Sequence, residues 1–455
     1  MTKMLSEPSI TVLGADPTHR KCILNGNAFQ QDAIVSFGGW QYAAFFSSLN
    51  NHTPEPLYVH LARRKLGDKE WEVLVFNDYP QTVDDGHNTV QMGICPGDGT
   101  IHLSYDHHCD VLRYRSSSLN LATSPSRFSW SPNLFTPTLD YLPGLPSTHA
   151  NFSYVTYPRF GFLGEEDMFC SFRDGKAGLG NDHLYIYRGQ QGRFEFVGTP
   201  LTGIQSNPYV HGMDYRNGKF HITWVYRGFV HYEGWDDLTD TKHKQQAGPN
   251  GAENNHDICY AYSDDSGYTW RNGHYEIIAD LRNGETVDNH TRGIVAFEIP
   301  KGRGLMNQEA QAVDHEGGVH VLNRDTMPLD SDGSDGIGEH LWKHYYRAPD
   351  GTWTRRALQP ITAGSRRGRL AISKQSDLYI ILPDSTTSSM RILKAKRTDG
   401  YAKYEQVWQG HGLTGEPLVD SARLQDDDVL SLFVRADVEG TSGEKKNVVV
   451  MDFQL

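Results

Sequence analysis

The chain has 455 residues and a formal net charge of -13. This acidic balance excludes a broad basic surface for nucleic acid or anionic membranes, so any anion site must be local. No apolar run approaches the roughly 20 residues that a membrane-spanning helix requires, and the first residues lack the apolar stretch of a secretion signal. We expect a monomer with neither nucleic acid nor membrane as a partner.

The composition favours short strands joined by tight turns. The chain holds 45 glycines, 21 prolines, 23 tyrosines and 9 tryptophans, and these residue types are typical of β-structure and its turns. Its five cysteines are scattered without a CxxC pair, which indicates free thiols rather than a disulfide framework or a zinc ribbon. The expected fold class is all-β.

A short strand of alternating residues recurs seven times in chain order. The copies begin at Gln41, Ile101, Met168, Phe220, Val319, Leu378 and Val429. A spacing of mostly about 50 to 70 residues leaves room for about four strands per copy, which favours a seven-bladed β-propeller as one domain over residues 1–455. The stretch ITVLG from Ile10 is expected to pair with VVVMDF, residues 448–453, and so close the ring.

Two further features belong to the fourth blade. The segment SDDSGYTW, residues 263–270, fits the Asp-box pattern, in which a short acidic side chain caps a turn and a Trp packs between strands. The polar stretch 235–255 just before it is predicted to be an inserted loop. Long loops on one face of a propeller usually shape a site.

Cations stand near the ends of four neighbouring repeat strands, in the order His107, Arg173, Arg227 and Arg324. We expect these repeat strands to be the inner strands of their blades. Equivalent ends of inner strands converge on one mouth of the central channel, so several cations there predict an anionic ligand. The alternative is that each cation pairs with a carboxylate beside it, because an aspartate neighbours three of them.

His87, His107, Tyr157, Arg173 and Arg227 make a poor metal site, because only the two histidines are good ligands. They suit an elimination. The C5 proton of a uronate becomes removable once its carboxylate is neutralised, and a Tyr or His can then take the proton while an acid protonates the leaving O4. No comparably placed pair of acids indicates hydrolysis.

The motifs DDGHN with His87, DGTIHLSYDHH with His107, TYPRF with Tyr157 and CSFRDG with Arg173 stand in this order along the chain. Together with NNHDICYAYSDDSGYTW they resemble the BNR, or Asp-box, propeller polysaccharide lyases. That group includes ulvan lyases and the fungal L-rhamnose-α-1,4-D-glucuronate lyases that act on gum arabic. The resemblance implies cleavage of the rhamnose–glucuronate linkage by β-elimination, which releases rhamnose and leaves a 4,5-unsaturated glucuronate.

The resemblance also implies roles for single residues. Tyr157 would be the principal proton carrier with His107 as its partner, although the two roles can be exchanged, and His87 would be the second active-site histidine. Arg173 would neutralise the carboxylate. The remaining substrate-binding residues would be Arg227, Asn88 and Arg324. No cofactor is needed for this chemistry; a structural calcium ion is compatible with the resemblance, but its ligands are unassigned.

Strand alternation separates the imidazoles of IHLSYDHH. His102 occupies the same place as a histidine in two other repeat strands, and His108 is expected to point away from His107, so both are predicted to be structural. Three alternatives stay open: an endo-acting ulvan lyase, a sialidase-like hydrolase and a non-catalytic propeller that binds acidic glycans. The compartment is not assigned, although an extracellular polysaccharide would require secretion.

Overall fold

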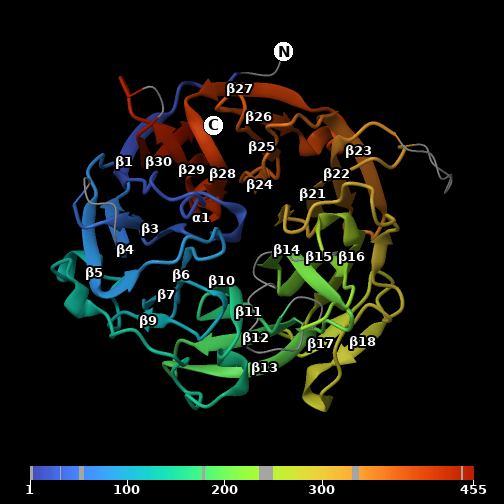
Figure 1. Ribbon diagram of the computed structural model, residues 1–455, viewed down its shortest axis with the longest axis horizontal. Helices are drawn as coiled ribbons and strands as arrows, with labels where there is room; N and C mark the ends of the chain where they lie inside the picture. Colours follow the sequence, from blue (N-terminus) through green and yellow to red (C-terminus); the bar gives the residue numbers. More distant parts are fainter. Residues whose placement is uncertain are drawn as a thin grey trace. The chain divides into compact units, whose positions relative to one another are not determined.

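The computed structural model describes residues 4–30, 32–50, 56–176, 180–234, 250–329, 338–441 and 444–455. Its strands form seven sheets of consecutive, mostly antiparallel strands (Figure 1). This confirms the expected fold class, an all-β seven-bladed β-propeller. Most of the predicted loop 235–255 lies outside the described residues, which include only its last part from residue 250. Among the described residues, no helix has the length and hydropathy that a membrane crossing needs.

The chain folds into two compact units. Unit 1 comprises residues 1–170, 186–195 and 363–455, and unit 2 comprises residues 171–185 and 196–362. Each unit is described by itself below.

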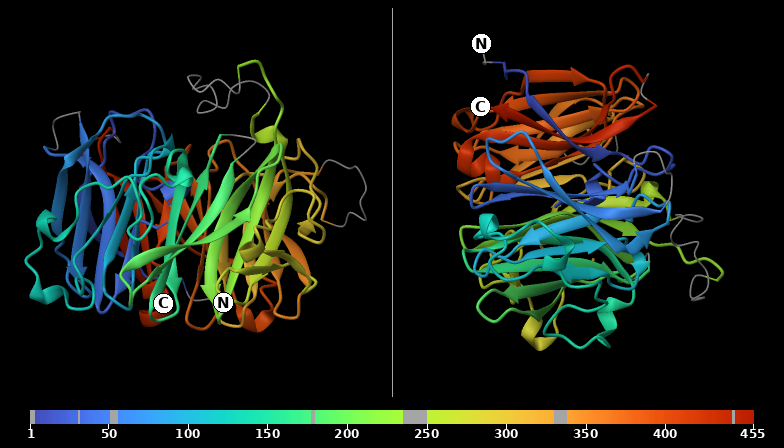
Figure 2. Two further views of the ribbon diagram at one scale, coloured as in Figure 1. Left: turned by 90° about the horizontal axis from the view of Figure 1, so that it is seen from below. Right: turned by 90° about the vertical axis from the view of Figure 1, so that its left-hand side faces the viewer.

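Unit 1 contains four complete sheets. The first is formed by β2 (Ile34–Phe37), β3 (Trp40–Ser48), β4 (Leu57–Lys65) and β5 (Glu72–Gln81). The second is formed by β6 (Val90–Ile94), β7 (Ile101–Tyr105) and β9 (Tyr114–Ser116). The sixth is formed by β24 (Arg369–Ile372), β25 (Leu378–Asp384), β26 (Ser389–Ala395) and β27 (Glu405–His411). Neighbouring strands alternate in direction, as Figure 2 shows.

The last sheet joins the two ends of the chain. It is formed by β28 (Leu413–Val419), β29 (Val429–Asp437), β30 (Lys446–Gln454) and β1 (Ser9–Ala15). Ile10 lies opposite Met451 in this sheet, which confirms the predicted pairing of these two stretches (Figure 1). The only α-helix of the described residues, α1 (Ser421–Asp427), is capped by Asp420, whose carboxylate also accepts hydrogen bonds from Ser36 and Gln41 of the first sheet.

Unit 2 contains the fourth and fifth sheets. The fourth is formed by β14 (Ser206–Arg216), β15 (Lys219–Gly228), β16 (Asn255–Ser263), β17 (Thr269–Arg271) and β18 (Ile277–Asp280), with β19 (Val295–Phe297) beside β16. The fifth is formed by β20 (Ala310–Val313), β21 (Val319–Asp325), β22 (Leu341–Arg347) and β23 (Trp353–Pro360). The third sheet, through which the division of the chain passes, is formed by β8 (His108–Asp110), β10 (Val155–Leu163), β11 (Asp167–Asp174), β12 (Asn181–Arg188) and β13 (Arg193–Leu201).

The Asp-box forms as predicted. Asp265 accepts the backbone N–H of Thr269 at 2.7 Å, and the Ser263 hydroxyl accepts that of Gly267 at 2.9 Å. Trp270 is fully buried and donates its indole N–H to the Gly267 carbonyl. The turn is therefore held by side chains that the pattern supplies.

The seven repeat strands are β3, β7, β11, β15, β21, β25 and β29. Each is paired on both sides with other strands of its own sheet. The expectation that they are the inner strands is wrong, because another strand of the same sheet precedes each of them. Most of their residues are buried for the same reason: side chains such as Phe46 of β3 and Leu103 of β7 share one core cluster, and burying a side chain of that size contributes about 1.5 to 3 kcal/mol.

Candidate active site

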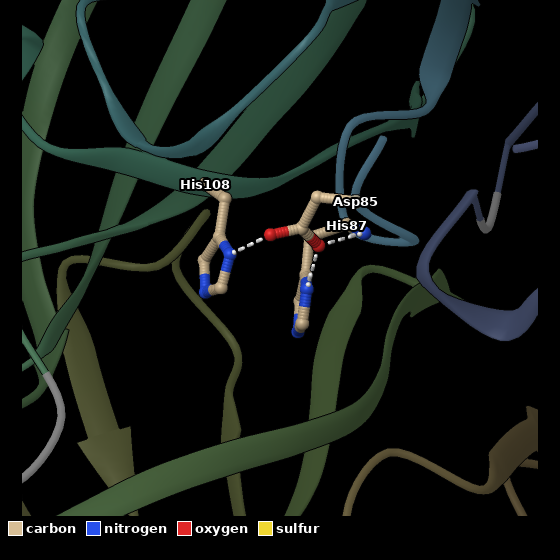
Figure 3. A group of neighbouring side chains, drawn as sticks. All are labelled: Asp85, His87 and His108. Carbon is tan, nitrogen blue, oxygen red and sulfur yellow. Dashed lines mark hydrogen bonds and ion pairs between the residues drawn. The ribbon is translucent and has the colours of Figure 1, made fainter. Parts of the chain in front are cut away.

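One carboxylate in unit 1 holds two imidazoles (Figure 3). Asp85 lies in the loop between β5 and β6. Its Oδ1 accepts hydrogen bonds from Nδ1 of His87 at 2.6 Å and from the His87 backbone N–H at 2.9 Å. Its Oδ2 accepts one from Nδ1 of His108, also at 2.6 Å. We call these three residues the Asp85 triad.

The triad fixes the tautomer of both rings. Burial raises the pKa of Asp85, but the hydrogen bonds from His108 and His87 outweigh it and hold that pKa well below the usual range. The carboxylate is therefore ionised and can only accept, so both histidines carry a proton on Nδ1. Nε2 of each ring points away from the carboxylate (Figure 3). With both rings neutral the triad carries one negative charge, and protonating one ring makes it neutral.

Aromatic rings extend the triad into a stack. The rings of His87 and His108 are 3.8 Å apart between centroids at an angle of 20°. Phe29 stacks on the other face of His87 at 4.6 Å. The Tyr157 ring lies 5.6 Å from His87 and 5.3 Å from Phe29. Two of the predicted site residues, His87 and Tyr157, are thus brought together.

Irregular backbone places these groups. Tyr157 has a φ of 58° and Cys109 a φ of 55°. These values lie in the left-handed region, which residues other than glycine rarely adopt. Thr156 lies opposite His108 in the short β8–β10 pairing, and its hydroxyl accepts the Cys109 N–H at 2.8 Å. Such strain persists only where the surrounding structure enforces it and is common at functional sites.

An arginine lies at the far side of Phe29. The Arg367 guanidinium is 4.8 Å from the Phe29 ring centroid. Glu416 fixes both partners, because it accepts the Ala28 N–H at 2.7 Å and the Arg367 N–H at 3.1 Å. Arg367 therefore adds a positive charge near the stack in unit 1, with Glu416 as its ion-pair partner at 3.5 Å.

His107 lies outside the triad. Its side chain is buried, and its Nε2 accepts the Arg113 backbone N–H at 2.8 Å. Burial, and then the charge of Arg113, lower its pKa well below the usual value, so the ring is neutral and its Nδ1 carries a hydrogen without a partner in the described residues. His108, expected to be structural, occupies the place beside His87 that was expected for His107.

Asn88 is also buried, at 1% exposure. Its amide donates to Asp106 at 2.8 Å, and Asp106 also accepts from Tyr79 and Gln81. This network anchors the loop that carries Asp85 to the end of β7. The predicted substrate contact of Asn88 stays a prediction, which the observed burial does not favour.

Two predicted arginines meet around a tyrosine in unit 2. Arg227 lies 4.7 Å from the centroid of the Tyr209 ring and Arg173 lies 5.8 Å from it. Burial raises the pKa of Tyr209, but the two guanidinium charges outweigh it, so the pKa is lowered. Arg227 donates from Nε to Asn255 at 2.8 Å, and its buried Nη2 has no partner among the described residues. Nη2 of Arg227 is therefore a donor that an anionic ligand could use.

Arg324 differs from these two arginines. Its Nε donates to Oε1 of Glu309 at 2.9 Å, and its Nη2 forms an ion pair with the same oxygen. Both side chains are almost fully buried, and the guanidinium covers the Trp342 ring at 4.2 Å. The paired-cation alternative therefore applies to Arg324, with Glu309 as the partner rather than the neighbouring Asp325, which pairs with Lys343.

The Asp85 triad is the only group of three potential metal ligands found among the described residues. Imidazole nitrogens bind a metal in the plane of the ring. Because the two rings are stacked, no ion can lie in both ring planes next to both Nδ1 atoms. Calcium prefers six or more oxygens, which the triad does not provide. The triad therefore does not fit calcium, and the predicted structural calcium stays without ligands. All five cysteines are free, as expected.

Three residues of this cluster were not among the sequence candidates: Asp85, Phe29 and Arg367. Asp85 stands two residues before His87 in DDGHN, so the acid–His spacing was a usable signal. Phe29 and Arg367 had none, because nothing in the sequence brings residues so far apart into contact.

Known proteins share this fold. Residues 40–360 match the BNR repeat-containing family. The solved structure of the polysaccharide lyase Uly1 is 19% identical, with a TM-score of 0.72, and the match covers 99% of this chain and 100% of that chain. A PL25 ulvan lyase bound to -[GlcA(1-4)Rha3S]- is 13% identical, with a TM-score of 0.63 over 99% of this chain and 94% of that chain. A search of curated proteins found no match. The match over most of its length shows that the chain belongs to the BNR repeat-containing family.

Proposed function

We propose that the protein is a polysaccharide lyase that cleaves the L-rhamnose-α-1,4-D-glucuronate linkage by β-elimination. The observation that carries the proposal is the Asp85 triad beside Tyr157, because it supplies two oriented imidazoles and a phenol within one cluster. The substrate is an acidic polysaccharide that contains rhamnose and glucuronate, such as gum arabic.

The reaction moves one proton from C5 and one to O4. The C5–H electrons form the C4–C5 double bond as the C4–O4 bond breaks, and the leaving rhamnosyl oxygen takes a proton. Tyr157 is the principal proton carrier in this proposal, and His108 takes the partner role first assigned to His107. The two roles remain exchangeable. Asp85 orients the imidazole and compensates the positive charge that develops on it.

The uronate carboxylate must be neutralised before C5 becomes acidic. Arg173 and Arg227 remain the predicted carboxylate-binding residues, supported by Nη2 of Arg227, which has no partner among the described residues. Arg324 is not part of this proposal, because Glu309 already neutralises it. The chemistry requires no cofactor.

A second candidate is an endo-acting ulvan lyase. It is favoured by one observation: the similar PL25 ulvan lyase has been solved with -[GlcA(1-4)Rha3S]- bound. Both candidates use the same elimination and differ in the sugar that leaves and in whether the chain is cut internally.

One incubation tests the proposal. The protein is supplied with gum arabic, and the ultraviolet absorbance of an unsaturated uronate is followed together with free rhamnose. Growth of both supports the proposal. Growth on ulvan alone moves the assignment to ulvan lyase, cleavage without the chromophore indicates a hydrolase, and binding without any product indicates a non-catalytic propeller.

A further inference from the structure

A cavity lies in unit 2, between the hairpin ends of the fourth and fifth sheets. It has a volume of about 180 Å³. The β14–β15 turn, the end of β16 and the turns before β21 and β23 surround it. The two sheets are joined there by a hydrogen bond of 2.8 Å from Asn217 to the His315 carbonyl. This volume is below the roughly 300 Å³ at which pockets for drug-sized ligands begin, so it suits one small ring.

Tyrosines form one wall of the cavity. The rings of Tyr260 and Tyr262 are 6.2 Å apart at an angle of 22°, and Tyr275 meets Tyr262 edge-on at 6.3 Å. Tyr275 is 54% exposed, which is unusual for so large an aromatic side chain. Aromatic faces of this kind pack against the C–H face of a pyranose.

Three cations line the same space: Arg216, Lys219 and Arg347. The Arg347 guanidinium is 4.9 Å from the Tyr260 ring, and Lys219 Nζ is 5.3 Å from the Tyr262 ring. Arg347 and Lys219 form no ion pair within the described part of the chain, and Nε of the buried Arg347 has no hydrogen-bond partner there. Glu316 is the one acid in the lining.

His221 also lines the cavity, but its imidazole is neutral and leaves this positive charge unchanged. Its Nδ1 is 2.9 Å from the Tyr260 hydroxyl, and burial, then the charges of Arg347 and Lys219, lower its pKa to about 3. The cavity therefore carries a net positive charge in a chain of net charge -13. An anion with an attached apolar face satisfies both walls.

The cavity is separate from the arginines that surround Tyr209. Lys219 is the first residue of β15 and Arg227 is next to its last, so a rise of about 3.3 Å per residue puts them roughly 25 Å apart along one strand. Within unit 2 the cavity and the Arg173–Arg227 pair thus lie at opposite ends of the fourth sheet.

We infer that this cavity is a second saccharide site, which binds one uronate residue of an acidic polysaccharide, with the carboxylate at Arg347 and Lys219 and the sugar face on the exposed ring of Tyr275. The choice of a uronate rests on the proposed function. A site of this kind raises the local concentration of a polymeric substrate, because the second binding event on one chain is intramolecular.

Calorimetric titration with sodium D-glucuronate tests the inference directly. We expect binding to the wild type that Lys219→Ala and Tyr275→Ala each weaken about tenfold, a loss of the size expected for one charged or aromatic contact. Lys65→Ala, which removes an exposed lysine of the first sheet, is the matched control. Binding that is unchanged in both cavity variants overturns the inference. Equal binding of D-glucose, or full displacement by inorganic sulfate, overturns it as well.

Kinetics separate this inference from the proposed function. With gum arabic, Lys219→Ala should raise KM several-fold and leave kcat unchanged, whereas with a short acidic oligosaccharide neither constant should change. An equal KM effect on both substrates contradicts a remote site. If no elimination occurs on any substrate, the proposed function fails while the glucuronate titration still decides the fate of the cavity.

Discussion

Asp85 and His108, 23 residues apart, are joined by a hydrogen bond of 2.6 Å between Oδ2 and Nδ1. The same carboxylate orients His87 through its other oxygen. One acid therefore sets the tautomer of two stacked imidazoles. Its loss should affect chemistry more than binding.

Asp85→Asn tests this relation. Asparagine has the same shape but replaces one acceptor oxygen by a donor NH₂ group, so its two ends cannot both accept hydrogen bonds from the two Nδ1–H groups. We expect kcat on the acidic polysaccharide to fall by about 10- to 100-fold with little change in KM. Steady-state kinetics measure both constants. The control is Asp84→Asn, since Asp84 accepts the backbone N–H groups of Lys21 and Cys22 and holds no imidazole among the described residues; an equal loss of kcat in that variant would contradict the orienting role.

Tyr157→Phe removes the predicted proton carrier. Turnover should fall by at least about 100-fold, because a positioned acid or base contributes that much, while the thermal unfolding midpoint changes little. Absorbance of the unsaturated product measures the rate. Tyr154→Phe, three residues earlier, should keep wild-type activity, and an active Tyr157→Phe would remove Tyr157 from the mechanism.

Substitutions of the neighbouring residues His107 and His108 should have different effects, one on stability and one on catalysis. His108→Gln should lower kcat by about 10²- to 10⁴-fold, because it removes one imidazole of the triad. His107→Gln should mainly reduce the free energy of unfolding, by about 1 to 3 kcal/mol, since it disturbs a buried acceptor of the Arg113 N–H. Urea unfolding and steady-state kinetics of both variants show which histidine is structural and which is catalytic. The reverse result would restore His107 as the catalytic histidine.

Arg324→Met should destabilise the fold without weakening substrate binding. The change leaves Glu309 buried without its partner, which costs about 3 to 5 kcal/mol. The matched variant Arg227→Met should instead raise KM for the acidic substrate, because Arg227 Nη2 has no partner of its own within the described residues. Chemical denaturation measures the stability of both variants, and KM measured on the folded protein shows which of them binds the substrate less tightly. A raised KM in Arg324→Met would return this arginine to the binding site.

The stability of the protein should fall in mild acid. Burial lowers the pKa of His102 from 6.5 to about 3, so between these two pH values the unfolded chain binds one more proton than the folded one at this site. The free energy of unfolding then falls by about 1.4 kcal/mol for each unit of pH lost in that window, and is unaffected by His102 above it. Unfolding of wild type and His102→Gln from pH 7.5 to 5 measures the slope. Equal slopes in the two proteins would contradict the buried neutral imidazole.

The sequence predicted the repeat strands, the Asp-box and the closure by β1 because each is a local pattern or a consequence of the repeat count. It placed His87, Tyr157, Arg173 and Arg227 among the candidates for the same reason. It favoured His107 over His108 because strand alternation was expected to continue through residues 106–109. The left-handed φ values of 65° at Asp106 and 55° at Cys109 break that alternation. Contacts such as Arg324 with Glu309 depend on pairing between strands, which no single stretch encodes.

The pairing of β1 with β30 has a consequence for biosynthesis. Ser9 is synthesised 443 residues before its partner Asp452 (452 minus 9). At about 5 to 20 residues per second, the first strand waits tens of seconds for its partner. During this interval an unpaired edge strand with exposed positions at Ile10 and Val12 is open to pairing with other chains. We therefore expect a chain truncated before β30 to favour aggregation over a stable six-bladed product.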